Sequence, residues 1–233
     1  MSRWLIEMKN LRTPLVLVPA VYYILLLVSI ALSDPGRPRN LYNYNELAFL
    51  PFVVMLTILM GRVEFGGRTM EIISTYPLSY TRLLLRKMAA ALASAVLLHA
   101  GLMGAYRLRF HTLEALYYPY NGASPGAADA GWLPLLLQAL PAYLLLAALT
   151  MLGMTLSRKL YGGLAAGFGL WMLSVLAPPG TLGPFVLLTA GLSENMSFPV
   201  NRLWLIGASM AAAAAAAVIL NRRSRWVVEG ETE

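Results

Sequence analysis

The chain has 233 residues, of which 58% are hydrophobic and only 12% are charged. A soluble domain carries about 25% charged residues, and the mean hydropathy here is +0.63. This composition excludes a soluble enzyme, a secreted domain and a disordered chain, and it predicts an integral membrane protein. The apolar residues form continuous runs, which excludes an outer-membrane β-barrel, and the absence of cysteine excludes disulfides and thiolate metal sites.

The first twelve residues predict an amphipathic helix at the membrane surface. Trp4, Leu5, Met8 and Leu11 fall at helical spacing among charged residues, as they do in helices that lie along a membrane interface. The apolar run that follows is too long for a cleavable signal peptide, and no small-residue cleavage site comes after it. We therefore expect range 1–12 to form an interfacial helix ahead of the first span.

Six apolar segments reach or approach the length of about 20 residues that a membrane-crossing helix needs. They are Thr13–Leu32, Glu46–Gly61, Met88–Tyr106, Trp132–Leu156, Leu160–Leu176 and Leu203–Leu220. A seventh patch, Leu182–Leu192, is roughly half a span long and lies among prolines and glycines. Its length and composition favour a re-entrant or interfacial helix, so we expect the range 178–200 to form an external re-entrant hairpin.

The basic residues support this count of six. With the N-terminus inside the cell, five of the 18 Lys and Arg residues lie outside and the other thirteen lie inside, in agreement with the positive-inside rule. The five outside are Arg37, Arg39, Arg107, Arg109 and Arg202. The range 221–233, which begins with the basic stretch Asn221–Arg225, then forms a cytoplasmic tail, and the net charge of +7 reflects topology and contact with anionic lipid instead of nucleic acid.

The longest external loop is Arg107–Gly131. It contains three tyrosines, followed by Asn121-Gly122 and Ser124-Pro125-Gly126. The tyrosines are typical of an aromatic belt at the membrane interface, and the rest predicts turns. Since no internal repeat and no second domain is evident, the expected fold is all-α: one polytopic membrane domain over 1–233 with six transmembrane helices.

The loop between the second and third spans, 63–87, is the most charged internal segment. Thr69 is placed to cap a short helix, and Pro77 ends that helix because proline disrupts the helix interior. Ser79 or Thr81 is then placed to cap the next helix, which leads into the third span. The pattern predicts a short helix held parallel to the membrane on the cytoplasmic face.

The stretch GRTMEIISTYPLSYTRLLLRK, residues 67–87, follows an acidic residue after the second span. It resembles the segment that permease subunits of type-2 ATP-binding cassette (ABC) exporters place after their second span. In that family the short helix is a coupling helix that docks in a groove of the ATPase subunit. The resemblance implies that the coupling element comprises Glu64, Arg68, Thr69, Glu71 and Pro77. It also places three basic residues at the membrane exit, namely Arg82, Arg86 and Lys87.

The family resemblance extends to the whole topology, with the external hairpin before the sixth span. Within that hairpin, Glu194 is either at the outer mouth of the path or a solvated loop residue. It implies a permease subunit of an ABC exporter in the prokaryotic cytoplasmic membrane, with both termini cytoplasmic. The implied partners are a second permease chain, identical or paralogous, and two copies of an ABC ATPase subunit. ATP and Mg²⁺ would be bound by that ATPase subunit.

The chain lacks an ATP site of its own and carries no catalytic motif. The nearest match to the phosphate-binding pattern G-x-x-x-x-G-K-[ST] is Gly61 and Gly66, but the next two residues are Gly67 and Arg68. H-E-x-x-H does not occur, and the match to G-x-S-x-G at Gly122–Gly126 falls among the turn residues of the external loop and not between a predicted strand and a predicted helix, as a nucleophile elbow requires. We therefore expect no enzyme activity in this chain.

Several features leave alternatives open. His99, inside the third span, is either a functional ionisable group or a neutral histidine hydrogen-bonded to a neighbouring helix. Glu46 is expected at the outer end of the second span, within reach of water. Gly163 and Gly167 permit close helix packing, either within the chain or at a subunit interface. Two other functions also remain open, an ATP-independent secondary carrier and a non-transporting membrane component in immunity, sensing or assembly.

Overall fold

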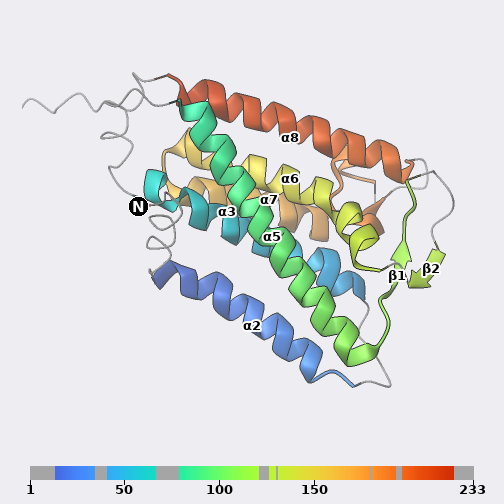
Figure 1. Ribbon diagram of the computed structural model, residues 1–233. Coiled ribbons are helices and arrows are strands. Elements are labelled where there is room, and N and C mark those ends of the chain that lie inside the picture. Colours follow the sequence, from blue (N-terminus) through green and yellow to red (C-terminus); the bar gives the residue numbers. More distant parts are fainter. Residues whose placement is uncertain are drawn as a thin grey trace, which may run out of the picture.

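The computed structural model describes residues 14–34, 41–66, 79–120, 126–129, 131–178, 180–192 and 196–222, and it is mostly helical (Figure 1). The α-helices in these ranges are α2 (Leu17–Ala31), α3 (Phe49–Phe65), α5 (Tyr80–Phe110), α6 (Trp132–Ser157), α7 (Leu160–Leu176) and α8 (Phe198–Leu220). A short 3₁₀ turn, η1 (Pro14–Val16), precedes α2. The predicted interfacial helix over 1–12 lies outside the described residues, as does most of the tail over 221–233.

Five helical stretches among the described residues are long and apolar enough to cross a membrane, which indicates a multi-pass membrane protein. They are Pro14–Ala31, Asn43–Phe65, Tyr80–Phe110, Trp132–Ser157 and Phe198–Leu220. The sixth apolar helix, α7, has the bounds that the sequence predicts but only 17 residues. At 1.5 Å per residue it is about 25 Å long, slightly less than the roughly 30 Å hydrocarbon core of a membrane.

Helix α6 forms the centre of the bundle and packs against α3, α5, α7 and α8, whereas α2 lies at the edge beside α5 and α3 (Figure 1). The small residues of α7 face this centre. A Cβ atom added to Gly163 would lie 2.8 Å from the carbonyl oxygen of Thr150 in α6, and one added to Gly167 would lie 2.7 Å from Cγ1 of Val54 in α3. Packing within the chain therefore accounts for both glycines.

The second apolar segment begins earlier than the sequence predicts, with a π-helical turn, η2 (Asn43–Leu47). The N–H of Ala48 donates to the carbonyl of Asn43 at 2.9 Å. Pro51, in the first turn of α3, has no N–H to offer the carbonyl of Leu47 four residues earlier. The indole N–H of Trp171, from α7, donates to that carbonyl at 3.1 Å. A side chain from another helix therefore satisfies the backbone group that the proline leaves without a partner.

The prediction of an all-α fold is wrong in the loop Arg107–Gly131. This loop contains two antiparallel strands, β1 (Glu114–Tyr117) and β2 (Gly126–Asp129), with Glu114 opposite Asp129. Turn residues between two short stretches are a hairpin signal as well as a loop signal. The bundle stabilises the ribbon, because Leu113 and Ala115 are 1% and 8% exposed, and a two-stranded hairpin alone is marginal.

The apolar patch Leu182–Leu192 is not the predicted re-entrant helix. Its described residues form two 3₁₀ turns, η3 (Gly183–Phe185) and η4 (Thr189–Gly191), joined by irregular backbone. Gly183 has φ +53°, a left-handed conformation that interrupts a helix, and Pro184 follows it. The residues between the two turns, 186–188, are buried against the bundle.

Candidate functional site

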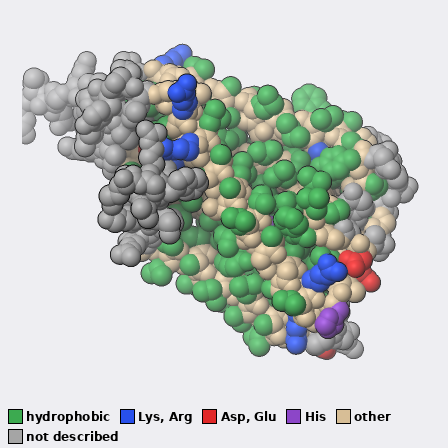
Figure 2. All heavy atoms as spheres, in the orientation of Figure 1, with side chains coloured by type: hydrophobic (Ala, Val, Ile, Leu, Met, Phe, Trp, Pro, Cys, Tyr) green, Lys and Arg blue, Asp and Glu red, His purple; other side chains and the backbone are tan. Residues whose placement is uncertain are grey.

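Positive charge gathers at one end of the bundle. We call it the basic end and define it by the described residues Arg62, Arg82, Arg86, Lys87, Arg158, Lys159 and Arg222. Figure 2 shows basic side chains beside the surface that α5 and α8 share at this end, with a largely apolar surface across the middle of the bundle. The opposite end, which carries β1 and β2, is called the ribbon end.

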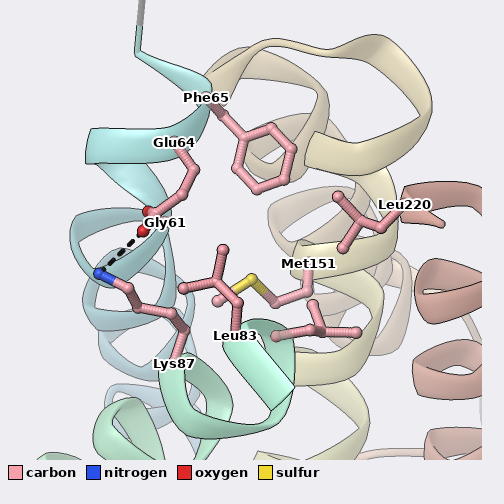
Figure 3. Close-up of a pocket in the computed structure, with 8 residues that line it drawn as sticks. Gly61, Glu64, Phe65, Leu83, Lys87, Met151 and Leu220 are labelled. Carbon is pink, nitrogen blue, oxygen red and sulfur yellow. Dashed lines mark ion pairs between the residues drawn. The ribbon is translucent and has the colours of Figure 1, made fainter. Parts of the chain in front are cut away.

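Glu64 and Lys87 form a shielded ion pair at the basic end. Lys87 Nζ lies 3.1 Å from Glu64 Oε1, and their side chains are 11% and 8% exposed (Figure 3). Glu64 belongs to the last turn of α3 and Lys87 to the third turn of α5. The pair therefore joins the helix that enters the predicted coupling segment to the helix that leaves it.

The ion pair lines a small pocket together with Gly61, Phe65, Leu83, Leu84, Met151 and Leu220 (Figure 3). The volume open to a water-sized sphere is about 10 Å³, which is near the minimum for one water molecule. Glu64 Oε2 has no hydrogen-bond donor among the described residues. The pocket is too small for a transported solute, so it is a feature of the helix junction and not a translocation path.

The remaining predicted coupling residues are only partly described. Arg68, Thr69, Glu71 and Pro77 lie outside the described residues, so the short helix predicted there is not described either. The cap of the following helix is confirmed, since Ser79 Oγ accepts a hydrogen bond from the backbone N–H of Arg82 at 3.4 Å.

The other two membrane-exit residues lie in the first two turns of α5. Arg82 and Arg86 are exposed there, whereas Lys87 points inward to Glu64. Glu194, predicted at an outer mouth, lies outside the described residues.

His99 is the centre of a buried hydrogen-bond network toward the ribbon end. The indole N–H of Trp132 donates to His99 Nδ1 at 3.2 Å, and His99 Nε2 lies 2.8 Å from Asn45 Oδ1. Because an indole N–H can only donate, Nδ1 is the acceptor, and Nε2 therefore carries the proton and donates to Asn45. Tyr143 completes the network through its hydroxyl, which donates to the carbonyl of Asn45 at 3.1 Å. The geometry matches the alternative of a neutral, hydrogen-bonded histidine.

The expectation that water reaches Glu46 is wrong, because Glu46 is 1% exposed. Its carboxylate accepts a hydrogen bond from Gln138 Nε2 at 2.9 Å, one from the backbone N–H of Thr189 at 2.7 Å, and one from the Thr189 hydroxyl at 2.9 Å. The irregular patch around η4 folds over η2, and Thr189 replaces water as a donor to this carboxylate. Burial raises the pKa of the neighbouring Tyr118 phenol, the charge of Glu46 raises it further, and Arg202 lowers it.

Arg202 is the second buried charge at the ribbon end. It is 1% exposed, although the sequence placed it among the external basic residues. One terminal nitrogen, Nη1, donates to the carbonyl of Leu187 at 3.1 Å, and the guanidinium carbon lies 4.8 Å from the centre of the Phe198 ring. The adjacent Asn201 donates to the carbonyls of Pro184 and Val186 at 2.9 and 3.1 Å.

Sequence reasoning missed the ribbon-end cluster of Asn45, Glu46, Gln138, Thr189 and Arg202. One signal was present, since an ionisable or amide side chain within an apolar run indicates a buried partner. The partners themselves are far apart in sequence, and no spacing rule connects them. Three or more His, Asp or Glu residues do not converge into a metal-binding group anywhere in the part of the chain that the structure describes.

Comparison of the chain with protein-family models, with curated proteins and with solved structures found no match. The resemblance to exporter permeases therefore rests on the sequence of the coupling segment and on the predicted topology. The geometry of the two ends of the bundle is the remaining guide to function.

Proposed function

We propose that this chain is a transmembrane permease subunit of an ABC exporter. The observation that carries the proposal is the shielded ion pair between Glu64 and Lys87, at 3.1 Å. It joins α3 and α5 where the predicted coupling segment leaves and re-enters the bundle. Because the ion pair holds the ends of α3 and α5 together, a force applied to that segment moves both helices and does not unwind their ends.

In this proposal the basic end faces the cytoplasm, because positive residues are retained on that side. All six helices, α7 included, cross the prokaryotic cytoplasmic membrane, and both termini are cytoplasmic. The Leu182–Leu192 patch lies at the external face, where it covers Glu46.

The proposed partners are a second permease chain, identical or paralogous, and two copies of an ABC ATPase subunit. The two permeases pair around a translocation path, and the ATPase subunits dock on the segment 67–78. ATP and Mg²⁺ are bound by the ATPase subunits, so ATP hydrolysis takes place outside this chain. Closure of the ATPase pair pushes the coupling segments and, through α3 and α5, switches the path from inward-facing to outward-facing.

The test is affinity purification of the tagged chain from its native membranes, with detection of any ABC ATPase that it retains. We expect the affinity-tagged permease to retain the ATPase and to change its rate of ATP hydrolysis. Glu71→Arg is expected to abolish both effects, because it reverses the charge of the predicted docking helix. Glu114→Arg, the same charge change on exposed β1 at the ribbon end, is the matched control and should leave both intact.

Two outcomes contradict different parts of the proposal. If no ATPase co-purifies under any nucleotide condition, the exporter function is wrong. If the complex forms and Glu71→Arg leaves binding and ATPase coupling unchanged, the coupling segment is assigned to the wrong residues.

A second candidate, an ATP-independent carrier, is favoured by the buried charges Glu46 and Arg202, since ionisable groups within membrane helices often mark transport pathways. Against it, the carboxylate of Glu46 is fully occupied by Gln138 and Thr189. Reconstituted vesicles distinguish the two functions. Solute movement driven by an ion gradient, with no ATPase present, would favour the carrier.

A further inference from the structure

Arg202 is a buried cation whose hydrogen-bonding capacity is mostly unused. A guanidinium has five N–H donors, and the contact to the carbonyl of Leu187 uses one of them. The ring of Phe198 covers one face of the guanidinium at 4.8 Å. Burying a charge costs several kcal/mol unless hydrogen bonds replace its hydration. A hydrogen-bond acceptor at the remaining N–H groups would therefore reduce the cost of burying this charge.

The unused donors are on one edge of the guanidinium. Neither Nε nor Nη2 of Arg202 has a hydrogen-bond partner within the described ranges. The N–H of Nε and one N–H of Nη2 point in parallel from the same edge, and this fork matches the two oxygens of a carboxylate or phosphate. The carbonyl of Leu187 accepts a hydrogen bond from the other terminal nitrogen, Nη1. The edge without a partner is therefore the Nε–Nη2 edge, which is the one suited to bidentate binding.

The buried carboxylate of Glu46 does not fill this edge. One of its oxygens accepts from Gln138, and both accept from Thr189. Thr189 and Leu187 belong to the same irregular segment, which separates the two charges and gives each a different partner. Glu46 and Arg202 therefore attract each other across the ribbon end without forming a direct ion pair.

Aromatic rings pack next to the guanidinium of Arg202. The ring of Tyr118 lies 5.5 Å and that of Tyr120 5.0 Å from the ring of Phe198, which itself packs on the guanidinium. A wall of this kind disfavours a fully hydrated inorganic ion and suits an anion attached to an apolar body. Aromatic side chains of this type also mark the membrane interface.

We propose that the Nε–Nη2 edge of Arg202 binds the carboxylate or phosphate group of an amphiphilic anion at the ribbon end. The anion is either the headgroup of an acidic lipid or an acidic solute on its way across the membrane. Both donor atoms are closed to solvent, so the anion enters when the 186–192 segment moves away from α8, and binding is slow. This proposal does not depend on an ATPase partner.

The experiment measures ligand binding to the purified chain in a neutral detergent. The probes are dihexanoyl phosphatidate, dihexanoyl phosphatidylcholine, hexanoate and inorganic phosphate, and the readouts are the thermal unfolding midpoint and native mass spectrometry. We expect phosphatidate to bind and to raise the midpoint, and phosphatidylcholine of equal chain length to do neither. Binding of phosphatidate alone identifies a lipid headgroup site, whereas binding of hexanoate as well identifies a site for small acids.

Two arginine variants decide whether Arg202 is the receptor. Arg202→Lys keeps the charge but loses the parallel donors, and we expect it to weaken phosphatidate binding at least about tenfold. Arg107→Lys, at an exposed arginine near the end of α5, is the matched control for an arginine-to-lysine change elsewhere at the ribbon end and should bind normally. Unchanged binding in Arg202→Lys overturns the proposal, as does preferential binding of inorganic phosphate alone.

The wild-type chain provides a test that does not depend on the variant's folding. If Arg202→Lys fails to fold, the comparison of phosphatidate with phosphatidylcholine in the wild type can still overturn the proposal. Equal binding of the two lipids, or binding of neither, overturns the proposal.

Discussion

At the residue scale, the informative side chains are the ionisable ones that have lost contact with water. Glu64 and Lys87 neutralise each other directly, whereas Glu46 and Arg202 are each satisfied, fully or in part, by neighbouring amide, hydroxyl and carbonyl groups. A buried ion pair contributes little relative to an apolar pair of the same shape, but removing one partner leaves an uncompensated charge. We therefore expect a substitution of one partner to destabilise the protein and an apolar substitution of both partners to change its stability little.

Lys87→Met is expected to lower the free energy of unfolding by about 3–5 kcal/mol, because Glu64 stays buried without its counter-charge. The paired variant Glu64→Leu with Lys87→Met should recover most of that loss. The measurement is thermal or denaturant unfolding of the protein in detergent. Arg82→Met, at an exposed position of the same helix, is the control and should behave like the wild type. Wild-type stability of Lys87→Met alone would show that the ion pair has no structural role.

At the element scale, helix contacts explain why unusual backbone is tolerated. Pro141 lies inside α6 and cannot donate to the carbonyl of Leu137, which instead accepts a hydrogen bond from the Tyr120 hydroxyl at 2.8 Å. Pro51 and Trp171 show the same arrangement in α3. With no water in the hydrocarbon core, a neighbouring side chain must serve as the donor. Such contacts fix how one helix sits against the next.

The glycines of α7 provide the prediction at this scale. Gly163→Ala is expected to destabilise the protein by about 1–3 kcal/mol, because the added methyl group meets the backbone oxygen of Thr150 at 2.8 Å. Gly169→Ala, on the same helix with nothing within 4 Å of the added Cβ, should be neutral or stabilising by up to about 1 kcal/mol. The measurement is the unfolding midpoint of each variant, compared with that of the wild type. Equal stability would mean that α7 shifts freely against α6.

At the scale of the whole molecule, the arrangement of charge predicts the orientation. Seven described basic residues lie at the basic end, while Arg107, Arg109 and the buried Arg202 lie toward the ribbon end. The asymmetry favours a cytoplasmic basic end. Helix α7 has 17 residues, so its crossing is the part of this orientation that calls for its own experiment.

Cysteine labelling can resolve the crossing of α7, because the chain contains no cysteine of its own. We expect Lys159→Cys and Arg222→Cys to react with a membrane-impermeant thiol reagent only from the cytoplasmic side. His111→Cys and Thr181→Cys should react only from the external side, since all four positions are exposed. Labelling of Thr181→Cys from the cytoplasmic side would show that α7 does not cross.

Local sequence patterns predicted the helices well because each depends on neighbouring residues. The bounds of α7 match the apolar run Leu160–Leu176, and Ser79 caps α5 as its position before the helix indicates. The same reasoning failed where a pattern had two meanings. The turn residues after Tyr120 were interpreted as a loop, but they join two paired strands. The patch Leu182–Leu192 was interpreted as a re-entrant or interfacial helix, but its described residues form short turns and irregular backbone.

The sequence by itself indicated that the chain is a membrane protein. It also indicated which segments form helices and at which end of the bundle positive charge is concentrated. These properties follow from the length of apolar runs and from charge counts, which need no knowledge of distant contacts. Only the tertiary structure decided which charges are buried and what satisfies them. Glu46 reaches Thr189 across 143 positions, and Glu64 reaches Lys87 from another helix, because the cost of burying a charge in a membrane protein is offset by whichever donors the packed bundle brings within reach.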